Sequence, residues 1–201
     1  ARSVRQGFEF MTDDVVEELA QEAVKKTNFL FGAGKPKAGE LPVVLGAGGS
    51  GILLHEAMGH PFEADFNRKG ESIFSDKMGK SIAKDFINIV EDGTMENNRG
   101  ALNIDDEGND VKKVYLVKDG VLESYLHDRI SAKHYGVEPT GNGRRQSFRH
   151  MPIPRMRITY MENGPHTTDD IISSVDYGVY VDNFTNGQVK IGAGDFTFFV
   201  K

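Results

Sequence analysis

The chain has 201 residues, which is enough for one sizeable hydrophobic core or for a domain with an appendage. Its 30 acidic residues outnumber its 24 basic ones, and the net charge of −6 argues against nucleic acid as the main partner, because phosphate binding requires a basic surface. The mean hydropathy of −0.42 and the absence of cysteine fit a globular protein without disulfide bonds, and no apolar run is long enough to cross a membrane.

Both ends of the chain suggest a piece of a longer, cytoplasmic protein. The first residue is not Met, and the first ten residues contain charges but no apolar segment of the kind found in a signal peptide. The last seven residues are strand-like, and no turn or polar tail follows them. We therefore expect residues 1–40 to be a helix and linker from the end of a preceding domain, and residues 41–201 to be a second domain truncated at its C-terminus.

An amphipathic helix is predicted directly after Thr12. Thr12 is a favourable N-cap, and Asp13 and Asp14 place negative charge at the positive end of the helix dipole. The apolar residues that follow recur at helical spacing: Val15, Val16, Leu19, Ala20, Ala23 and Val24. A Gly/Pro-rich loop, a short buried strand over 41–45, a glycine-rich turn and a short helix over 52–59 are expected next.

The rest of the chain is mostly strand-like. The predicted strands cover 86–90, 111–117, 121–126, 156–161, 179–181, 188–191 and 195–201. The Asp119-Gly120 pair is typical of a tight hairpin turn, and Thr167 is a predicted cap for a short helix that ends near Val175. The fold class is therefore α+β, with an N-terminal helix and a short motif helix packed on a largely antiparallel, strand-rich domain.

The strongest chemical signal is the segment His55-Glu-Ala-Met-Gly-His60. Zinc favours imidazole nitrogen ligands, and a catalytic zinc site leaves one position open for water. A carboxylate beside such a site can act as general base. The residue types therefore indicate a metallopeptidase, with His55 and His60 as zinc ligands and Glu56 as the base.

The spacing of the two histidines is unusual for a helical metal site. Residues five apart lie about 140° apart around a regular α-helix, so the two rings would not converge on one ion. The residue before a proline avoids the α region, and a glycine can take a left-handed conformation at a helix end. We therefore expect His60 to lie just beyond the helix end, with Gly59 in the left-handed conformation turning it back towards His55.

Weaker signals each have a structural alternative. The glycine-rich segment 46–51 lacks the Lys-Ser/Thr ending of a phosphate-binding loop, and we interpret it as a turn. The polar loops 65–70 and 140–145 offer Asp65, Arg68, Asn142 and Arg144 as candidate substrate-binding residues, since an arginine can hold a peptide carboxylate. In the alternative interpretation the glycines form turns and the arginines are solvated. The isolated His127, His134, His150 and His166 are interpreted as structural or surface residues.

The block Leu53-Leu-His-Glu-Ala-Met-Gly-His-Pro-Phe-Glu-Ala-Asp-Phe-Asn-Arg-Lys-Gly70 resembles the TldD/PmbA family, on its TldD side. Further similar segments follow in the same order, at 91–94, 103–108, 139–145, 152–156 and 183–189. Several collinear matches are far more specific than one motif.

The resemblance implies a cytoplasmic zinc metallopeptidase that acts on short or unfolded peptides in peptide maturation and degradation. It assigns one zinc ion to His55 and His60 and the general base to Glu56. It also implies an extended peptide bound along a sheet edge and a homologous subunit as partner, in a homodimer or heterodimer. The family's third zinc ligand is a downstream cysteine, which this chain lacks, so we expect weak zinc binding and no useful catalysis from the chain alone.

Two other functions remain open from the sequence. One is a non-catalytic module that binds peptides or a partner subunit. The other is a regulator of DNA gyrase, a role with which this family has been associated. The net negative charge argues against direct DNA binding in that second case.

Overall fold

The computed structural model describes residues 2–35, 37–48, 51–182, 184–190, 193 and 195–200, and for 184–189 and 195–200 it describes the backbone. The helices are α1 (Asp13–Phe31), α2 (Gly51–Leu54), α3 (Ala64–Arg68), α4 (Arg129–Tyr135) and α5 (Thr168–Ser173), with 3₁₀ turns at Phe8–Phe10 and His60–Phe62 and a π-helical turn at His55–Gly59. The strands are β1 (Val43–Leu45), β2 (Ile89–Asp92), β3 (Lys113–Lys118), β4 (Val121–Leu122), β5 (Gly143–Arg144), β6 (Ile153–Pro154), β7 (Thr159–Met161), β8 (Val179–Val181), β9 (Phe184–Lys190) and β10 (Asp195–Val200).

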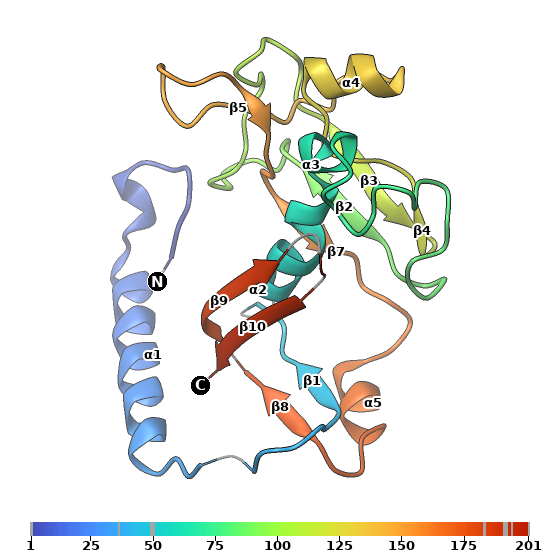
Figure 1. The fold of residues 1–201 in the computed structure, drawn as a ribbon. Coiled ribbons are helices and arrows are strands. Elements are labelled where there is room, and N and C mark those ends of the chain that lie inside the picture. Colours follow the sequence, from blue (N-terminus) through green and yellow to red (C-terminus); the bar gives the residue numbers. More distant parts are fainter. Residues whose placement is uncertain are drawn as a thin grey trace.

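The hydrophobic core lies around a four-stranded antiparallel sheet of order β4-β3-β2-β7 (Figure 1). Its buried members come from the sheet, from α3 and the turn before it, from the segment after β4 and from the segment between β6 and β7: Phe62, Ala64, Ile89, Leu116, Val117, Leu122, Tyr125, Leu126 and Met156. Other described strand pairs are β5–β6 and β9–β10, both antiparallel, and β1–β8, which is parallel. The predicted α+β class with a largely antiparallel arrangement is confirmed.

The hairpin turn between β3 and β4 is confirmed at Asp119 and Gly120. Both residues have positive φ, 48° and 76°, as a tight two-residue hairpin turn requires. A Cβ atom on Gly120 would lie 2.6 Å from the carbonyl oxygens of Ala83 and Lys84, so the turn also packs closely on the preceding loop.

Several predicted boundaries moved, and two helices were missed, one of which is α3, where residues 65–70 were expected to form a polar loop. Strand β2 extends to Asp92, two residues beyond the strand predicted over 86–90, and Glu91 is buried there and accepts hydrogen bonds from the Asn142 amide and the Thr159 hydroxyl. Helix α4 was not predicted, although Asp128 forms a capping box at its start and Gly136 ends it in the left-handed conformation.

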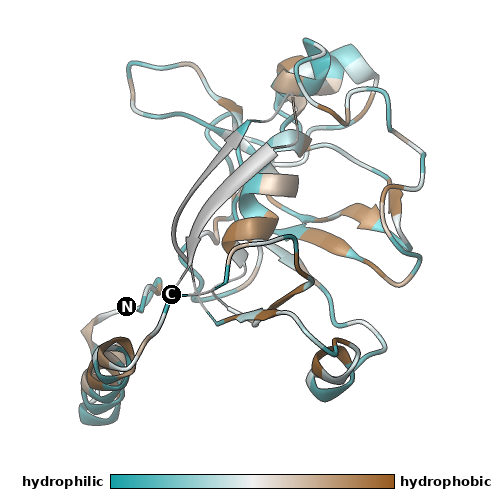
Figure 2. Cartoon of the chain, turned by 60° about the horizontal axis from the view of Figure 1, so that its bottom comes forward, coloured by the Kyte–Doolittle hydropathy of each residue, from teal (hydrophilic) through white to brown (hydrophobic). Residues whose placement is uncertain are grey.

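The elements outside the main sheet are less buried. Thr12 caps α1 as predicted and accepts a hydrogen bond from the backbone of Val15, but no residue of this helix is buried. Figure 2 shows α1 standing away from the rest of the chain. Strand β1 was expected to be buried, yet Val43 is 54% exposed and its two neighbours are half-buried. Thr167 caps α5 as predicted. No described helix combines the length and apolar character needed to cross a membrane.

Candidate metal centre

The histidine motif lies on one continuous helical segment whose turn widens in the middle. Helix α2 leads into the π turn at His55–Gly59, and the backbone N–H of His60 donates to the carbonyl oxygen of His55. This is an i to i+5 hydrogen bond, which places residues five apart above one another as an α-helix does for residues four apart. The unusual spacing of the two histidines therefore matches the local helix type.

The expected route to convergence was wrong. Gly59 has φ −58° and ψ −59°, and His60 has φ −60° and ψ −44°, so both are right-handed helical and His60 has not left the helix. Pro61 has no N–H to continue the hydrogen-bond ladder, and it lies in the 3₁₀ turn His60–Phe62. A Cβ on Gly59 would lie 1.9 Å from the sulfur of Met156, so a larger residue at this point of the π turn would require the Met156 side chain to move.

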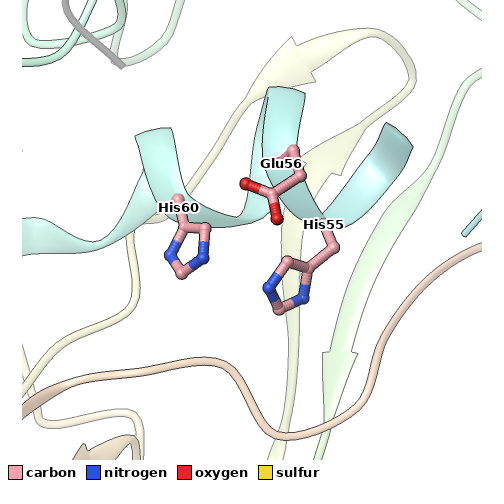
Figure 3. A group of neighbouring side chains, drawn as sticks. All are labelled: His55, Glu56 and His60. Atoms are coloured by element: carbon pink, nitrogen blue, oxygen red, sulfur yellow. The ribbon is translucent and has the colours of Figure 1, made fainter. Parts of the chain in front are cut away.

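Three side chains of this segment form a cluster that can hold a metal ion. The ligand atoms of His55, Glu56 and His60 all lie within 4.8 Å of one another. The two imidazole rings have centroids 4.6 Å apart and are nearly perpendicular, and both project from the same side of the segment (Figure 3). Two ligand atoms bound to the same tetrahedral zinc ion are about 3.4 Å apart. Small side-chain rotations would bring the ligand atoms of these residues to that separation, so the residues fit the metal.

A buried carboxylate holds one of the two rings. The Nδ1 atom of His60 lies 3.2 Å from the Oε1 atom of Glu63, whose side chain is fully buried. The other oxygen of Glu63 accepts a hydrogen bond of 3.0 Å from the guanidinium of Arg155, which also lies 3.8 Å from Asp65. A carboxylate on one ring nitrogen fixes the tautomer and directs the other nitrogen outward, as in many histidine metal ligands.

The two histidines have opposite pKa shifts. Contact with Glu63 raises the pKa of His60, while partial removal of the His55 ring from water lowers the pKa of His55, with further lowering by the charges of His60 and Arg144. Burial raises the pKa of both Glu63 and Asp65. The site therefore has one imidazole that readily stays neutral and a second that is held by a carboxylate partner.

The four candidate substrate residues lie in different surroundings. Asn142 is buried, and its amide donates to Glu91 and to the carbonyl of Arg155 while it accepts from Thr140. Asp65 is largely buried beside Arg155. Arg68 is half-buried on α3, and Arg144 is exposed on β5. Of these four, Arg144 lies at the surface with its charge acting on His55.

The isolated histidines do not join the cluster. His127 is buried among Tyr125 and Tyr135, and burial lowers its pKa to about 4. His134 contacts Tyr135, and His166 contacts Phe86. These contacts agree with the structural interpretation made from the sequence.

Sequence reasoning missed Glu63 and Arg155 as supporting residues. Glu63 follows His60 by three positions, a helical spacing that could have indicated the contact. Arg155 is 92 positions away from Glu63, and no local signal connects the two. The β9–β10 hairpin, whose backbone lies against the π turn, was predicted as strands but not as a neighbour of the motif (Figure 1).

Comparison with known proteins places this geometry in a family. The model of the PmbA/TldA metallopeptidase C-terminal domain matches residues 38–201. A metalloprotease TldD homologue of Buchnera aphidicola is 48% identical over 91% of this chain and 38% of its own length. A zinc metalloprotease TldD homologue of Saccharolobus solfataricus is 34% identical over 99% of this chain and 44% of its own.

The fold agrees with these sequence matches. The crystal structure of TldE from Thermococcus kodakarensis superimposes with a TM-score of 0.75 and 26% identity, over 91% of this chain and 42% of that one. The chain thus spans less than half of the length of each of these relatives. Domain model, sequence and fold agree, and the chain belongs to the PmbA/TldA family of metallopeptidases.

Proposed function

We propose that this chain is the metal-binding part of a zinc peptidase that hydrolyses short or unfolded peptides. His55 and His60 are the protein ligands of one zinc ion, and Glu56 is the general base. The observation that carries the proposal is the π turn, which brings two histidines five positions apart to a ring separation of 4.6 Å with Glu56 beside them.

Each residue has a separate task in this mechanism. A bound zinc ion supplies Lewis acidity and lowers the pKa of bound water. Glu56 accepts the proton of the attacking water and delivers it to the amine that leaves. Glu63 keeps the Nδ1 side of His60 occupied, so that the Nε2 side is the one available to the metal.

The zinc site needs a third protein ligand beyond His55 and His60. Catalytic zinc sites have three protein ligands and one open position, and this chain contains no cysteine to supply the missing one. We place the third ligand on a downstream cysteine of a longer protein, in line with relatives of which this chain covers 38–44%. The chain by itself then binds zinc weakly and does not turn over peptide.

The remaining proposals concern partners and location. The peptide lies extended along a sheet edge, where main-chain hydrogen bonds give affinity without sequence preference, and the β9–β10 hairpin beside the π turn provides such an edge. A homologous subunit pairs with the protein in the cytoplasm. No direct contact with nucleic acid is proposed, and binding to DNA that weakens steeply with salt would contradict this point.

The test compares three variants of the complete protein. Glu56→Gln should retain zinc and lose about 10²–10⁴-fold in peptide hydrolysis, because the base is gone while both ligands remain. His55→Ala should lose the zinc. Glu138→Gln, an exposed glutamate on another part of the chain, is the matched control and should change neither quantity.

Zinc content is measured by elemental analysis after gel filtration, and hydrolysis with an unstructured fluorogenic peptide. Undiminished turnover in Glu56→Gln would remove the role of Glu56. Absence of zinc from the wild-type protein, even after metal is supplied, would favour a non-catalytic peptide-binding or partner-binding module.

A further inference from the structure

One cavity of the molecule, away from the histidine cluster in sequence, is lined largely by arginines. It has a volume of about 370 Å³, and four of its seven lining residues are Arg5, Arg99, Arg144 and Arg157. The other three carry no charge, so the lining contains four positive charges and no carboxylate. Four like charges around one cavity repel one another unless an anion lies among them.

Among the residues that the structure describes, the four guanidinium groups form no ion pair with an acidic side chain. Within the described residues, none of them lies within 4.0 Å of a carboxylate, whereas Arg2 and Arg155 do form ion pairs. Their hydrogen bonds go to neutral carbonyl groups instead. Arg157 donates to Gly141 at 2.8 Å, Arg144 donates to Met156 at 3.3 Å, and Arg5 donates to Ala101.

Two carboxylates near Arg157 accept hydrogen bonds from groups other than its guanidinium. Asp105 accepts backbone hydrogen bonds from Glu107, Asn109 and Gly143. Glu91 accepts from the backbone of Arg157 and from the side chains of Asn142 and Thr159. The guanidinium of Arg157 is half-buried and loses part of its hydration, which lowers its pKa. The cavity therefore contains a partly desolvated cation on which Asp105, Glu91 and Asp106 act only through space, with no carboxylate of the described residues within 4.0 Å.

The cavity is connected to the metal centre through two contacts. Arg144 donates to the carbonyl oxygen of Met156, and the Met156 side chain packs against Gly59 in the π turn between the two histidines. The charge of Arg144 also acts directly on His55. Arg144 therefore links the cavity to the segment that contains the proposed zinc site.

We propose that this arginine-lined cavity binds a carboxylate of the peptide substrate and so positions the peptide on the metal centre. The proposal rests on the proposed peptidase function and adds a substrate class to it. Arginine pairs with carboxylate through two parallel hydrogen bonds, which give orientation as well as affinity. The volume is at the lower end of small-ligand sites and suits one or two peptide residues. The carboxylate belongs either to the C-terminus of the peptide or to an Asp or Glu side chain.

The binding test uses metal-free complete protein, so that a carboxylate cannot bind zinc and no peptide is cut. Three probes are compared by calorimetry: tetra-alanine as free acid, tetra-alanine amide, and the amide of Ala-Ala-Asp-Ala. The free acid should bind at least about tenfold more tightly than the tetra-alanine amide, as expected for one charge-assisted contact. Equal binding of the aspartate peptide and the free acid identifies any carboxylate as the ligand, whereas weak binding of the aspartate peptide identifies the C-terminus.

Two single variants locate the binding site. Arg99→Gln and Arg144→Gln should each reduce the preference for the free acid to within about threefold, and Arg144→Lys should restore part of it. Arg149→Gln is the matched control, because Arg149 is exposed beside Phe148 and lies outside the cavity lining. Circular dichroism of each variant verifies the fold, and Arg99 has an exposed side chain whose loss should not disturb it.

Equal affinity of all three probes for the wild-type protein would overturn the proposal, as would a preference that survives both substitutions. The outcome is separable from that of the proposed function. If the zinc-loaded protein hydrolysed the free acid and the amide at equal kcat/KM, the peptidase activity would be supported and the carboxylate subsite rejected. If the protein bound carboxylates tightly but cut no peptide, the subsite would be supported and the peptidase activity rejected.

Discussion

The sheet region and the outer elements of this chain are built from equally clear sequence signals but differ sharply in burial. In the first region, β2, β3, β4 and β7 enclose side chains with no exposed surface, among them Phe62, Leu116 and Tyr125. In the second region, α1 and α5 contain no buried residue, and Phe31 at the end of α1 is 86% exposed. A good helix cap therefore indicates where a helix begins, not whether the helix contributes to a core.

The metal centre belongs to the first region. His60 is followed by Pro61 and Phe62, which are both buried, and Glu63 beneath the ring has no exposed surface. A π turn contains poorer local hydrogen-bond geometry than an α-helix and needs support from its surroundings. The buried region supplies this support.

Removing a core ring should have the largest effect. Phe62→Ala should lower the free energy of unfolding by about 3–5 kcal/mol, because Phe62 is fully buried and packs on Phe74 at a ring separation of 4.9 Å. Phe31→Ala in α1 should change it by about 0.5 kcal/mol or less. Chemical denaturation measures both. Equal losses would show that α1 packs on the rest of the protein in solution.

Acid should destabilise the buried region through His127. Burial lowers its pKa to about 4, so the unfolded chain, with a histidine pKa of about 6.5, binds the proton first as the pH falls. Stability is therefore fully present above about pH 6.5 and is lost progressively towards pH 4, by an amount on the order of 3 kcal/mol.

His127→Gln should flatten this part of the pH–stability profile. The matched control is His166→Gln, which removes an exposed histidine near the start of α5. A wild-type profile that is already flat between pH 6.5 and 4 would show that the His127 ring is hydrated or paired in solution.

Changing the carboxylate under His60 should weaken zinc binding. Glu63→Gln keeps the shape of the side chain but removes the charge that holds Nδ1, so zinc affinity should fall about 10–100-fold. Glu18→Gln is the control, since Glu18 forms an exposed ion pair with Arg2 on α1. Competition with a chelator measures the affinity in the complete protein, and an unchanged affinity would mean that Glu63 serves the core alone.

The smallest difference is expected between two helix caps. Asp128→Ala at α4 should cost about 1–2 kcal/mol, because Asp128 is buried and accepts a 2.7 Å hydrogen bond from the backbone of Ser131. Thr12→Ala at α1 should cost about 0.5 kcal/mol, because its 3.3 Å bond is exposed. A larger loss at Thr12 would mean that α1 is coupled to the core.

Features that depend on a few neighbouring residues were predictable from the sequence by itself. Thr12 and Thr167 begin their helices as expected, and the Asp119-Gly120 pair forms the tight turn, because capping and positive φ are properties of local backbone geometry. The histidine motif likewise indicated three side chains that lie close enough together to hold a metal ion. The helix was wrongly predicted to end at Gly59, because in a regular α-helix two histidines five positions apart do not point in the same direction.

The tertiary structure decided how that motif is used. The Met156 side chain packs against Gly59 in the π turn, and His60 contacts Glu63, which is in turn held by Arg155, 92 positions beyond Glu63. Long-range contacts of this kind leave no periodic signal in the sequence, because they arise only when the sheet brings distant segments together. The burial of one region and the exposure of α1 were decided in the same way, since an apolar stripe becomes a core only where another surface covers it.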